Sequence, residues 1–370
     1  MKRWTQLIIA ILIIGFLTGC TTAGAASSWP AYTTSEQTGY YAYGPQIYAL
    51  ENKNGNLLWK FPQEADNARQ YYAAPAVDEE LVVAGDYNNT LTALDAGTGS
   101  KKWDFISAKD RYIGPTLLTE KAIYAPNADH YLYAIDRTGS LLWKFKAAGP
   151  NWTKPVTDGN LIIFASMDHH VYAFQPEYAL GSLSMDDDGS RTLVTSPEWA
   201  ADLSVAIVAD PLIQDGKVYV GTINGDLVCL DAENGKTIWT FNDNGNAGSI
   251  WGSPVIFEDN LFFADTNGQV YAVSPDTGKP TWLKPFSAGS SVVASGVPTE
   301  SGVAYTTTEG RVFIIDASQN LSPVTTLETP LYSTPAYVNG FLILAPTSKD
   351  KLFTAIDLSG KEVWGFIPSK

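Results

Sequence analysis

Short runs of apolar residues alternate along the chain with clusters of Gly, Asn, Asp and Ser. The runs are rich in β-branched and aromatic residues and are bounded by Gly, Asn and Asp, which indicates strands, and no segment sustains a helical period. Asn224-Gly225, Asn234-Gly235 and Asn267-Gly268 lie between runs and supply residues that tolerate the positive φ of tight hairpin turns. The pattern predicts an all-β protein of short strands and tight turns.

One unit of this pattern recurs: an apolar strand, an acidic residue, a Gly turn and a Trp. A clear copy is LDAENGKTIWTF at 230–241. The small residue inside each strand gives a mean spacing of about 44 residues, within the range of four-stranded propeller blades. We therefore expect residues 29–370 to form an eight-bladed β-propeller of four-stranded antiparallel blades. The register positions are Ala49, Ala93, Ala134, Ala173, Cys229, Ala272, Ile314 and Ala355.

The spacing is broken once, between Ala173 and Cys229. We place an insertion at 178–197 there, in blade four between its third and fourth strands. It contains the acidic run Asp186–Asp188, which we interpret as a solvated loop because a calcium loop would need an acidic first position and a closing Glu. Because it joins the third and fourth strands, we expect it to project from the face opposite the channel mouth at which the fourth-to-first-strand connections meet.

The recurring Trp is expected to pack between neighbouring blades, where it would bury about 200 Å² of indole surface. A blade that is apolar on both faces needs such packing, because it cannot stand alone. These Trp are therefore interpreted as structural residues and not as a cofactor site. They are Trp59, Trp103, Trp143, Trp239, Trp282 and Trp364, with Trp199 at the corresponding place in blade four.

The N-terminus differs from the rest of the chain. Lys2 and Arg3 precede an apolar run at 7–17 and the sequence LTGC at 17–20, which predicts a secretory signal peptide over residues 1–19. LTGC resembles the lipobox of bacterial lipoproteins, and this resemblance implies diacylation at Cys20. Two or more acyl chains anchor a protein stably. Residues 20–28 would then be the lipidated Cys and a flexible tether; the alternative is an ordinary signal with a chance Cys.

Charge and cysteine content limit the possible partners and cross-links of the protein. The chain has 24 basic and 39 acidic residues; removal of Lys2 and Arg3 with the signal leaves 22 basic residues and a net charge of −17. Such a surface repels nucleic acid and excludes it as a partner. Only Cys229 would remain beside the lipidated Cys20, so no intramolecular disulfide can form.

The segment 93–103, ALDAGTGSKKW, resembles the Trp-docking motif of the PQQ-like (quinoprotein) repeat, and blades five and six match it with small changes. Combined with the lipobox, this resembles the BamB family of outer-membrane assembly lipoproteins. The first implied function is a PQQ- and Ca²⁺-dependent dehydrogenase with a catalytic Asp and commonly an adjacent-Cys disulfide. The second is a non-catalytic scaffold that binds envelope proteins, with a β-barrel assembly complex as the specific partner.

The residues favour the scaffold. There is no Cys pair, and the chain lacks the long insertions that cover the cofactor in the dehydrogenases. We therefore expect no cofactor, no metal and no catalytic residue, and keep PQQ with Ca²⁺, or another small ligand, as the alternative. The location implied is the outer membrane facing the periplasm in a Gram-negative host, and otherwise the outer face of the cell membrane.

Candidate partner-binding residues come from the segments before the innermost strands. Seven repeats have a Pro there, and five have an aromatic residue three positions earlier. These connections should converge at one mouth of the channel, where aromatic residues beside Arg are typical of protein-binding hot spots. The alternative is that the rings only plug the channel. The candidates are Tyr72, Tyr112, Trp152, Trp251 and Tyr332, with Arg69 and Arg111 nearby.

Two further patterns receive structural interpretations. His130 and His169 align with Gly225, Gly268 and Gly310, which indicates a turn position and not a metal site. The segment 28–32 is similar to 333–337, which indicates that blade one supplies its own inner strand and that the ring closes without strand exchange.

Overall fold

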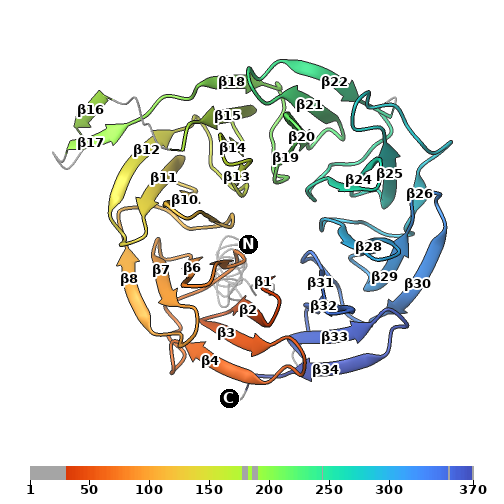
Figure 1. Cartoon of the computed structure of the whole chain (residues 1–370), viewed down its shortest axis with the longest axis horizontal. Coiled ribbons are helices and arrows are strands. Elements are labelled where there is room, and N and C mark those ends of the chain that lie inside the picture. Colours follow the sequence, from red (N-terminus) through yellow and green to blue (C-terminus); the bar gives the residue numbers. More distant parts are fainter. Residues whose placement is uncertain (1–30, 177–181, 186–190, 244, 349–350, 369–370) are drawn as a thin grey trace, which may run out of the picture.

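The computed structural model describes residues 31–368, except 177–181, 186–190, 244 and 349–350. The described chain forms eight antiparallel sheets arranged around a central channel, with the chain passing once around the ring (Figure 1). This confirms the predicted all-β, eight-bladed propeller. Over the described residues, no helix with the length and apolar character needed to cross a membrane is present.

Each blade runs from its innermost to its outermost strand. Blade one is β1 (Ala31–Thr34), β2 (Thr38–Tyr43), β3 (Gln46–Glu51) and β4 (Leu57–Phe61). Blade two is β5 (Ala76–Val77), β6 (Leu81–Gly85), β7 (Leu91–Asp95) and β8 (Lys101–Phe105). Blade three is β9 (Leu117–Leu118), β10 (Ala122–Pro126), β11 (Tyr131–Asp136) and β12 (Leu141–Lys146). Blade four is β13 (Val156–Thr157), β14 (Ile162–Ala165), β15 (His170–Phe174) and β18 (Trp199–Asp202).

The second half of the ring repeats this order. Blade five is β19 (Leu212–Gln214), β20 (Lys217–Gly221), β21 (Leu227–Asp231) and β22 (Thr237–Phe241). Blade six is β23 (Val255–Phe257), β24 (Asn260–Ala264), β25 (Gln269–Val273) and β26 (Phe286–Ser287). Blade seven is β27 (Val297–Thr299), β28 (Gly302–Thr306), β29 (Arg311–Ile315) and β30 (Leu321–Thr326). Blade eight is β31 (Ala336–Val338), β32 (Phe341–Leu344), β33 (Phe353–Asp357) and β34 (Glu362–Phe366).

The core lies between the blades. The middle strands are buried on both faces, so they read as continuous apolar runs in the sequence. One cluster joins Val83 and Ala93 of blade two to Tyr133 and Ile135 of blade three, and similar clusters follow around the ring. The small residue of each third strand is buried at this contact; Cys229, which replaces the usual Ala in blade five, is fully buried.

The two faces of the propeller are built from different connections. We call the mouth face the side that carries the fourth-to-first-strand connections and the hairpins between second and third strands; there, Tyr71 N–H donates to the Gly44 carbonyl at 2.9 Å. The turn face carries the turns between first and second and between third and fourth strands; there, Ala96 N–H donates to the Glu80 carbonyl at 3.0 Å. Each innermost strand therefore begins at the mouth face and ends at the turn face.

In every blade except blade seven, whose outer strand β30 contains no Trp, a Trp joins the blade to the next one. Trp59 of β4 is 7% exposed, and its indole N–H donates to the Ala96 carbonyl of blade two at 2.9 Å. Trp143 packs in the same sense, stacked against Phe174 of blade four with ring centroids 5.5 Å apart. The same indole-to-carbonyl bond is made by Trp103 to Arg137, Trp199 to Ala232, Trp239 to Pro275, Trp282 to Ala317 and Trp364 to Asn52.

The acidic residue and the Gly of the repeat shape the turn that receives this Trp. The Asp95 carboxylate accepts bonds from the backbone and hydroxyl of Thr98, and these bonds lower the pKa of Asp95. Gly99 follows at a φ of 69°, a left-handed conformation that Gly adopts without strain. A Cβ built on Gly99 would lie 2.5 Å from the Trp59 ring, so a side chain cannot be accommodated there.

The ring closes without strand exchange, as the sequence similarity predicted. Blade one contains only N-terminal strands and blade eight only C-terminal strands. Their junction repeats the general contact, with the Trp364 indole donating to the Asn52 carbonyl at 2.7 Å. Tyr41 and Phe353 also pack across it, with ring centroids 4.1 Å apart.

The segment between β15 and β18 does not simply project from a face. It contains a hairpin, β16 (Ser182–Met185) and β17 (Arg191–Val194), and β17 lies parallel to β12 of blade three, with Lys144 opposite Val194. The sheet of blade three thereby gains two strands at the outer rim (Figure 1). A free outer strand edge offers unpaired backbone groups, which explains why it accepts β17. The acidic run Asp186–Asp188 lies outside the described residues.

Replacing Trp59 with Ala should lower the free energy of unfolding by about 3–5 kcal/mol, because it removes a buried indole and leaves a cavity between two blades. Urea unfolding followed by circular dichroism measures this. Trp251→Ala is the control, because that Trp is 48% exposed, and it should change stability by less than about 0.5 kcal/mol. Equal effects of the two changes would show that the Trp59 contact does not stabilise the blade junction.

Gly99→Ala should destabilise more than Gly216→Ala. Both Gly have a similar φ, 69° and 72°, but a Cβ meets Trp59 at the first position and open space at the second. The second change costs about 1–2 kcal/mol of backbone strain, and the first adds an overpacking cost of about 1–3 kcal/mol. In the double variant Trp59→Ala/Gly99→Ala the extra cost should disappear; additive effects in this double-mutant cycle would contradict the direct contact.

Candidate functional site

The channel opens at the mouth face into a cavity of about 480 Å³. Its wall is formed mainly by small and hydroxyl-bearing residues at the beginnings of the innermost strands. A cavity of this size is within the range of small-molecule sites. The wall comprises residues 31–33, 72–77, 115–118 and 332–334, with Ile113, Lys154, Asp210 and Ser295.

Two predicted partner-binding residues are exposed on the mouth face. Trp251 is 48% exposed and Tyr332 is 41% exposed, and Tyr332 borders the cavity. Ile223, in the hairpin of blade five, is 38% exposed, and the Ser249 hydroxyl donates to its carbonyl at 2.5 Å, which holds the connection that carries Trp251 against this hairpin. Exposed aromatic and aliphatic side chains in one area are typical of contact surfaces.

The structure corrects the prediction for Tyr112, which is fully buried and therefore packs within the protein instead of facing a partner. It lies against Gly85, where an added Cβ would be 2.3 Å from the Tyr112 Cβ. Tyr72 is 8% exposed and stacks on Tyr87, with ring centroids 3.9 Å apart. Trp152 is partly buried, and its indole nitrogen has no hydrogen-bond partner among the described residues. The aromatic residues are thus divided between packing and surface.

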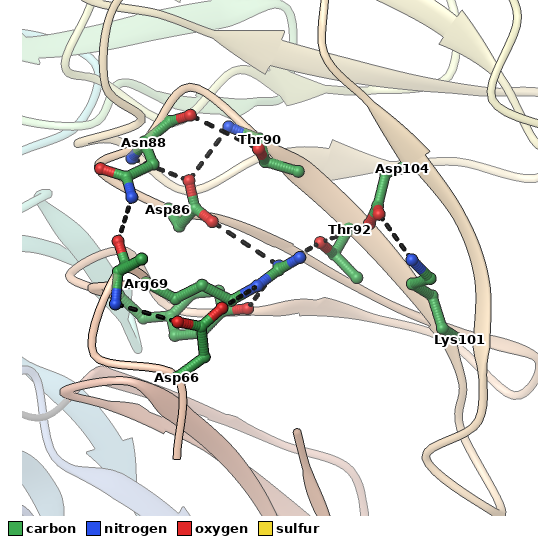
Figure 2. A network of polar contacts seen from close by, with 10 residues as sticks. Asp66, Arg69, Asp86, Asn88, Thr90, Thr92, Lys101 and Asp104 are labelled. Atoms are coloured by element: carbon green, nitrogen blue, oxygen red, sulfur yellow. Dashed lines mark hydrogen bonds and ion pairs between the residues drawn. The ribbon is translucent and has the colours of Figure 1, made fainter. Parts of the chain in front are cut away.

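The prediction that Arg69 contacts a partner is also wrong, because its guanidinium points into the junction of blades one and two (Figure 2). Its Nη1 donates to the Thr92 hydroxyl at 3.0 Å and lies 3.6 Å from the Asp86 carboxylate. Thr92 in turn donates to Asp104, which pairs with Lys101 at 2.7 Å. Hydrogen bonding to Tyr71 and the nearby carboxylates raise the pKa of Arg69 against the effect of burial. Arg69 fixes the 62–75 connection in place and is not a surface contact.

Arg111 remains on the surface of the mouth face. Its side chain is 50% exposed and its guanidinium lies over the Tyr87 ring, 5.4 Å from the centroid. Because Tyr87 stacks on Tyr72, the three side chains form one layered group beside the cavity. Sequence reasoning missed Tyr87, which follows Asp86 in the hairpin between β6 and β7. Aligning these hairpins as well as the connections would have placed it on the same face.

The residues two or three positions before the innermost strands give the channel most of its polar groups. These positions are Ala74, Gly114, Lys154, Asp210, Ser253, Ser295 and Thr334 among the described residues. Several are linked from blade to blade by a backbone N–H that donates to the next side chain: Lys154 to Asp210 at 2.7 Å, Ser253 to Ser295 at 2.8 Å and Ser295 to Thr334 at 3.1 Å. In blade seven Gly296, not Pro298, precedes the strand, because Pro298 lies inside β27. The ring carries one positive and one negative charge.

The pKa of the Asp210 carboxyl group in this ring is shifted. Burial raises the pKa of Asp210 to about 6, although the Lys154 N–H and ammonium group act in the opposite direction. Its carboxyl group would therefore change charge near pH 6 inside the channel.

His130 and His169 occupy left-handed turn positions with φ of 76° and 79°, as their alignment with Gly predicted. Asp168 lies in the hairpin between β14 and β15, beside His169. Its carboxylate accepts hydrogen bonds from the Ala148 N–H at 2.8 Å and from the Tyr172 hydroxyl at 2.7 Å. It therefore joins the connection to the hairpin. Within the described residues, no group of three or more His, Cys, Asp or Glu side chains is arranged to hold a metal ion.

Of the two cysteines, Cys229 lies within the described residues. Cys229 is buried, and burial raises its pKa to about 12, so its thiol is unreactive at neutral pH. Cys20, the signal peptide and the tether lie outside the described residues.

Asp210→Asn should alter the pH dependence of stability. The folded-state pKa is raised above the unfolded value of about 4, so ionisation of Asp210 removes stability as pH rises from about 4 to about 6. Asn keeps the acceptor for Lys154 N–H but does not ionise. The stability of the variant relative to the unsubstituted protein should thus increase by about 1–2 kcal/mol between pH 4 and pH 7 in urea unfolding. A constant difference across this range would contradict the raised pKa.

Three relatives are similar to this chain over different lengths. Outer membrane protein assembly factor BamB of Shewanella oneidensis is 20% identical over 376 residues, which cover 95% of this chain and 86% of that protein. Tetrathionate hydrolase of Acidithiobacillus ferrooxidans is 22% identical over 244 residues, 63% of this chain and 48% of that protein. Quinoprotein ethanol dehydrogenase of Pseudomonas putida is 31% identical over 258 residues, 58% of this chain and 34% of that protein. Among the first curated relatives, the matches span about half to two thirds of their length.

A solved structure has the same fold. BamB from Moraxella catarrhalis superposes with a TM-score of 0.69 at 16% identity, covering 85% of this chain and 92% of that one. The family model described as outer membrane protein assembly factor BamB matches residues 4–113 and 195–366. These two segments include most of the chain, so the protein belongs to the outer membrane protein assembly factor BamB family.

Proposed function

We propose that this protein is a non-catalytic scaffold of the cell envelope, anchored by a lipid at Cys20, which binds protein partners during the assembly of outer-membrane β-barrels. Membership of the BamB family supports the assembly role and the envelope location. In a Gram-negative host the lipid would hold the propeller at the outer membrane, facing the periplasm.

The observation that carries the proposal is the exposed group on the mouth face. Trp251, Tyr332 and Ile223 expose apolar surface, and Arg111 lies on the same face. Buried interface centres are enriched in Trp, Tyr and Arg because these side chains combine large contact area with hydrogen-bonding ends. The rigid ring of blades holds them without the ordering cost that a flexible loop would incur on binding.

The channel residues do not fit PQQ with Ca²⁺. A quinone with three carboxylates requires several cationic or amide donors, and Ca²⁺ requires six to eight oxygen ligands with carboxylates among them. The described wall of the cavity offers one ammonium group, Lys154, and one carboxylate, Asp210, which is already bonded by a backbone N–H. This donor set supports a scaffold over a quinoprotein dehydrogenase.

Partner capture tests the proposal. Acylated, tagged protein in detergent extract of its own envelope should recover components of the barrel-assembly machinery, identified by mass spectrometry. Trp251→Ala/Tyr332→Ala should weaken capture about tenfold or more, since each hot-spot truncation costs at least about 1–2 kcal/mol. Leu283→Ala is the control, because it removes an apolar side chain that is more exposed than Trp251 or Tyr332 but lies before the outermost strand of blade six, and it should leave capture unchanged.

Two results would contradict the proposal. Equal capture by the double variant and the unsubstituted protein would remove the mouth face as the binding surface. Dye reduction by the purified protein that depends on added PQQ and Ca²⁺ would identify an enzyme instead.

A further inference from the structure

The first described strand starts at the mouth of the channel. In β1, Ala31 pairs with Ala42 at the mouth-face end of β2, and Thr34 pairs with Gly39 at the turn-face end. Ala31 also lines the channel cavity together with Tyr32 and Thr33. The polypeptide that precedes Ala31 is therefore joined to the propeller at the centre of the mouth face, and not at its rim.

The length of that polypeptide limits where a lipid on Cys20 can lie. Ten residues lie between Cys20 and Ala31, which makes eleven steps along the backbone, and a fully extended chain spans at most about 3.6 Å per step, or about 40 Å in total. A path to the turn face would cross the disc from channel to rim, at least about 20 Å for a domain of this length, and then descend a blade one strand high, about 17–20 Å. That path is about as long as the fully extended tether, so a lipid on Cys20 would stay on the mouth side.

The residues around the two ends of the channel also differ in charge. At the mouth, the residues two positions before the innermost strands include one Lys and one Asp, Lys154 and Asp210. At the turn face, the turns directly after the innermost strands carry exposed acidic residues in seven of the eight blades and one exposed basic residue, Lys121, while blade eight has Asn339-Gly340. The acidic residues are Glu36, Glu79, Glu80, Glu120, Asp158, Asp215, Glu258, Asp259 and Glu300.

This acidic ring is unfavourable beside a membrane that contains anionic lipid, because the surface potential of such a membrane repels negative side chains. The mouth instead presents Trp251 and Tyr332, whose rings combine apolar area with a polar end and suit the region near lipid headgroups. The mouth face also carries exposed acidic residues, among them Glu64, Asp66, Glu309 and Glu328, so the acidic ring agrees with the orientation but chain connectivity is the argument that favours it.

We propose that the mouth face is held toward the membrane and that the acidic turn face points away from it. This inference rests on the lipid anchor of the proposed function. A partner of the mouth face then binds on the membrane side of the propeller, within about 40 Å of the bilayer, while the turn face stays open to the surrounding compartment.

Energy transfer from two labelled sites to an acceptor lipid tests the orientation. Asn224→Cys places a fluorophore on an exposed mouth-face hairpin, and Glu300→Cys places one on the turn face. The native Cys229 is buried and does not compete for the label. Acylated protein is reconstituted in phosphatidylethanolamine vesicles that contain some phosphatidylglycerol and a headgroup-labelled acceptor, and acylation is verified by the mass of the intact protein.

We expect severalfold greater transfer from Asn224→Cys than from Glu300→Cys. Insertion of a Gly/Ser linker of twenty residues after Ser28 should reduce this difference, because the lengthened tether no longer restricts the propeller. Equal transfer from the two sites, or greater transfer from Glu300→Cys, with acylation verified would overturn the proposed orientation. Partner capture is measured in detergent without a bilayer, so failure of the scaffold function is detected separately.

Discussion

The contact between each Trp and the next blade is the interaction on which the rest of the structure depends. An isolated four-stranded blade leaves both apolar faces in water, and the indole wedge covers one of them while its N–H satisfies a carbonyl of the neighbouring turn. The turn must be shaped to receive it, which explains why an acidic residue, a left-handed Gly and a Trp recur together. The same contact at Trp364 and Asn52 closes the ring. The junction of blade seven with blade eight differs, because β30 carries no Trp and Val324 packs there against Leu342 and Ile356.

A closed ring of this kind fixes the functional surface by geometry. All fourth-to-first-strand connections meet on one face, and they are held to the hairpins by backbone bonds and by carboxylates such as Asp168. Spacing from the Pro does not identify equivalent positions in every blade. Tyr112 N–H donates to the Asp86 carbonyl as Ile250 N–H donates to the Thr222 carbonyl, so Tyr112 corresponds to the buried Ile250 and not to Trp251. Tyr112 lies under the connection and packs on Gly85, whereas Trp251 and Tyr332 remain exposed. Contact residues on this face are therefore a subset of the aromatic residues, chosen by local packing.

The polar groups of the mouth are few and mostly satisfied. Arg69 is used to hold a blade junction, Arg111 lies over Tyr87, and Asp210 accepts a backbone bond from the neighbouring blade. This sparse set supports binding of a protein surface and provides little for the chemistry of a quinone cofactor. The described chain enters the propeller at the centre of the same face, which is why the proposed lipid anchor would hold this face toward the membrane.

The sequence by itself determined the repeat, the number of blades, the docking role of the Trp and the closure of the ring, because these depend on local patterns: strand period, turn residues and spacing. Only the tertiary structure decided which repeated positions are exposed. Burial of Tyr112, the inward turn of Arg69 toward Thr92 and Asp86, and the pairing of β17 with β12 depend on contacts with residues of other strands and, for β17, of another blade. Exposure and strand-edge pairing are set by neighbouring blades, which a linear pattern does not contain.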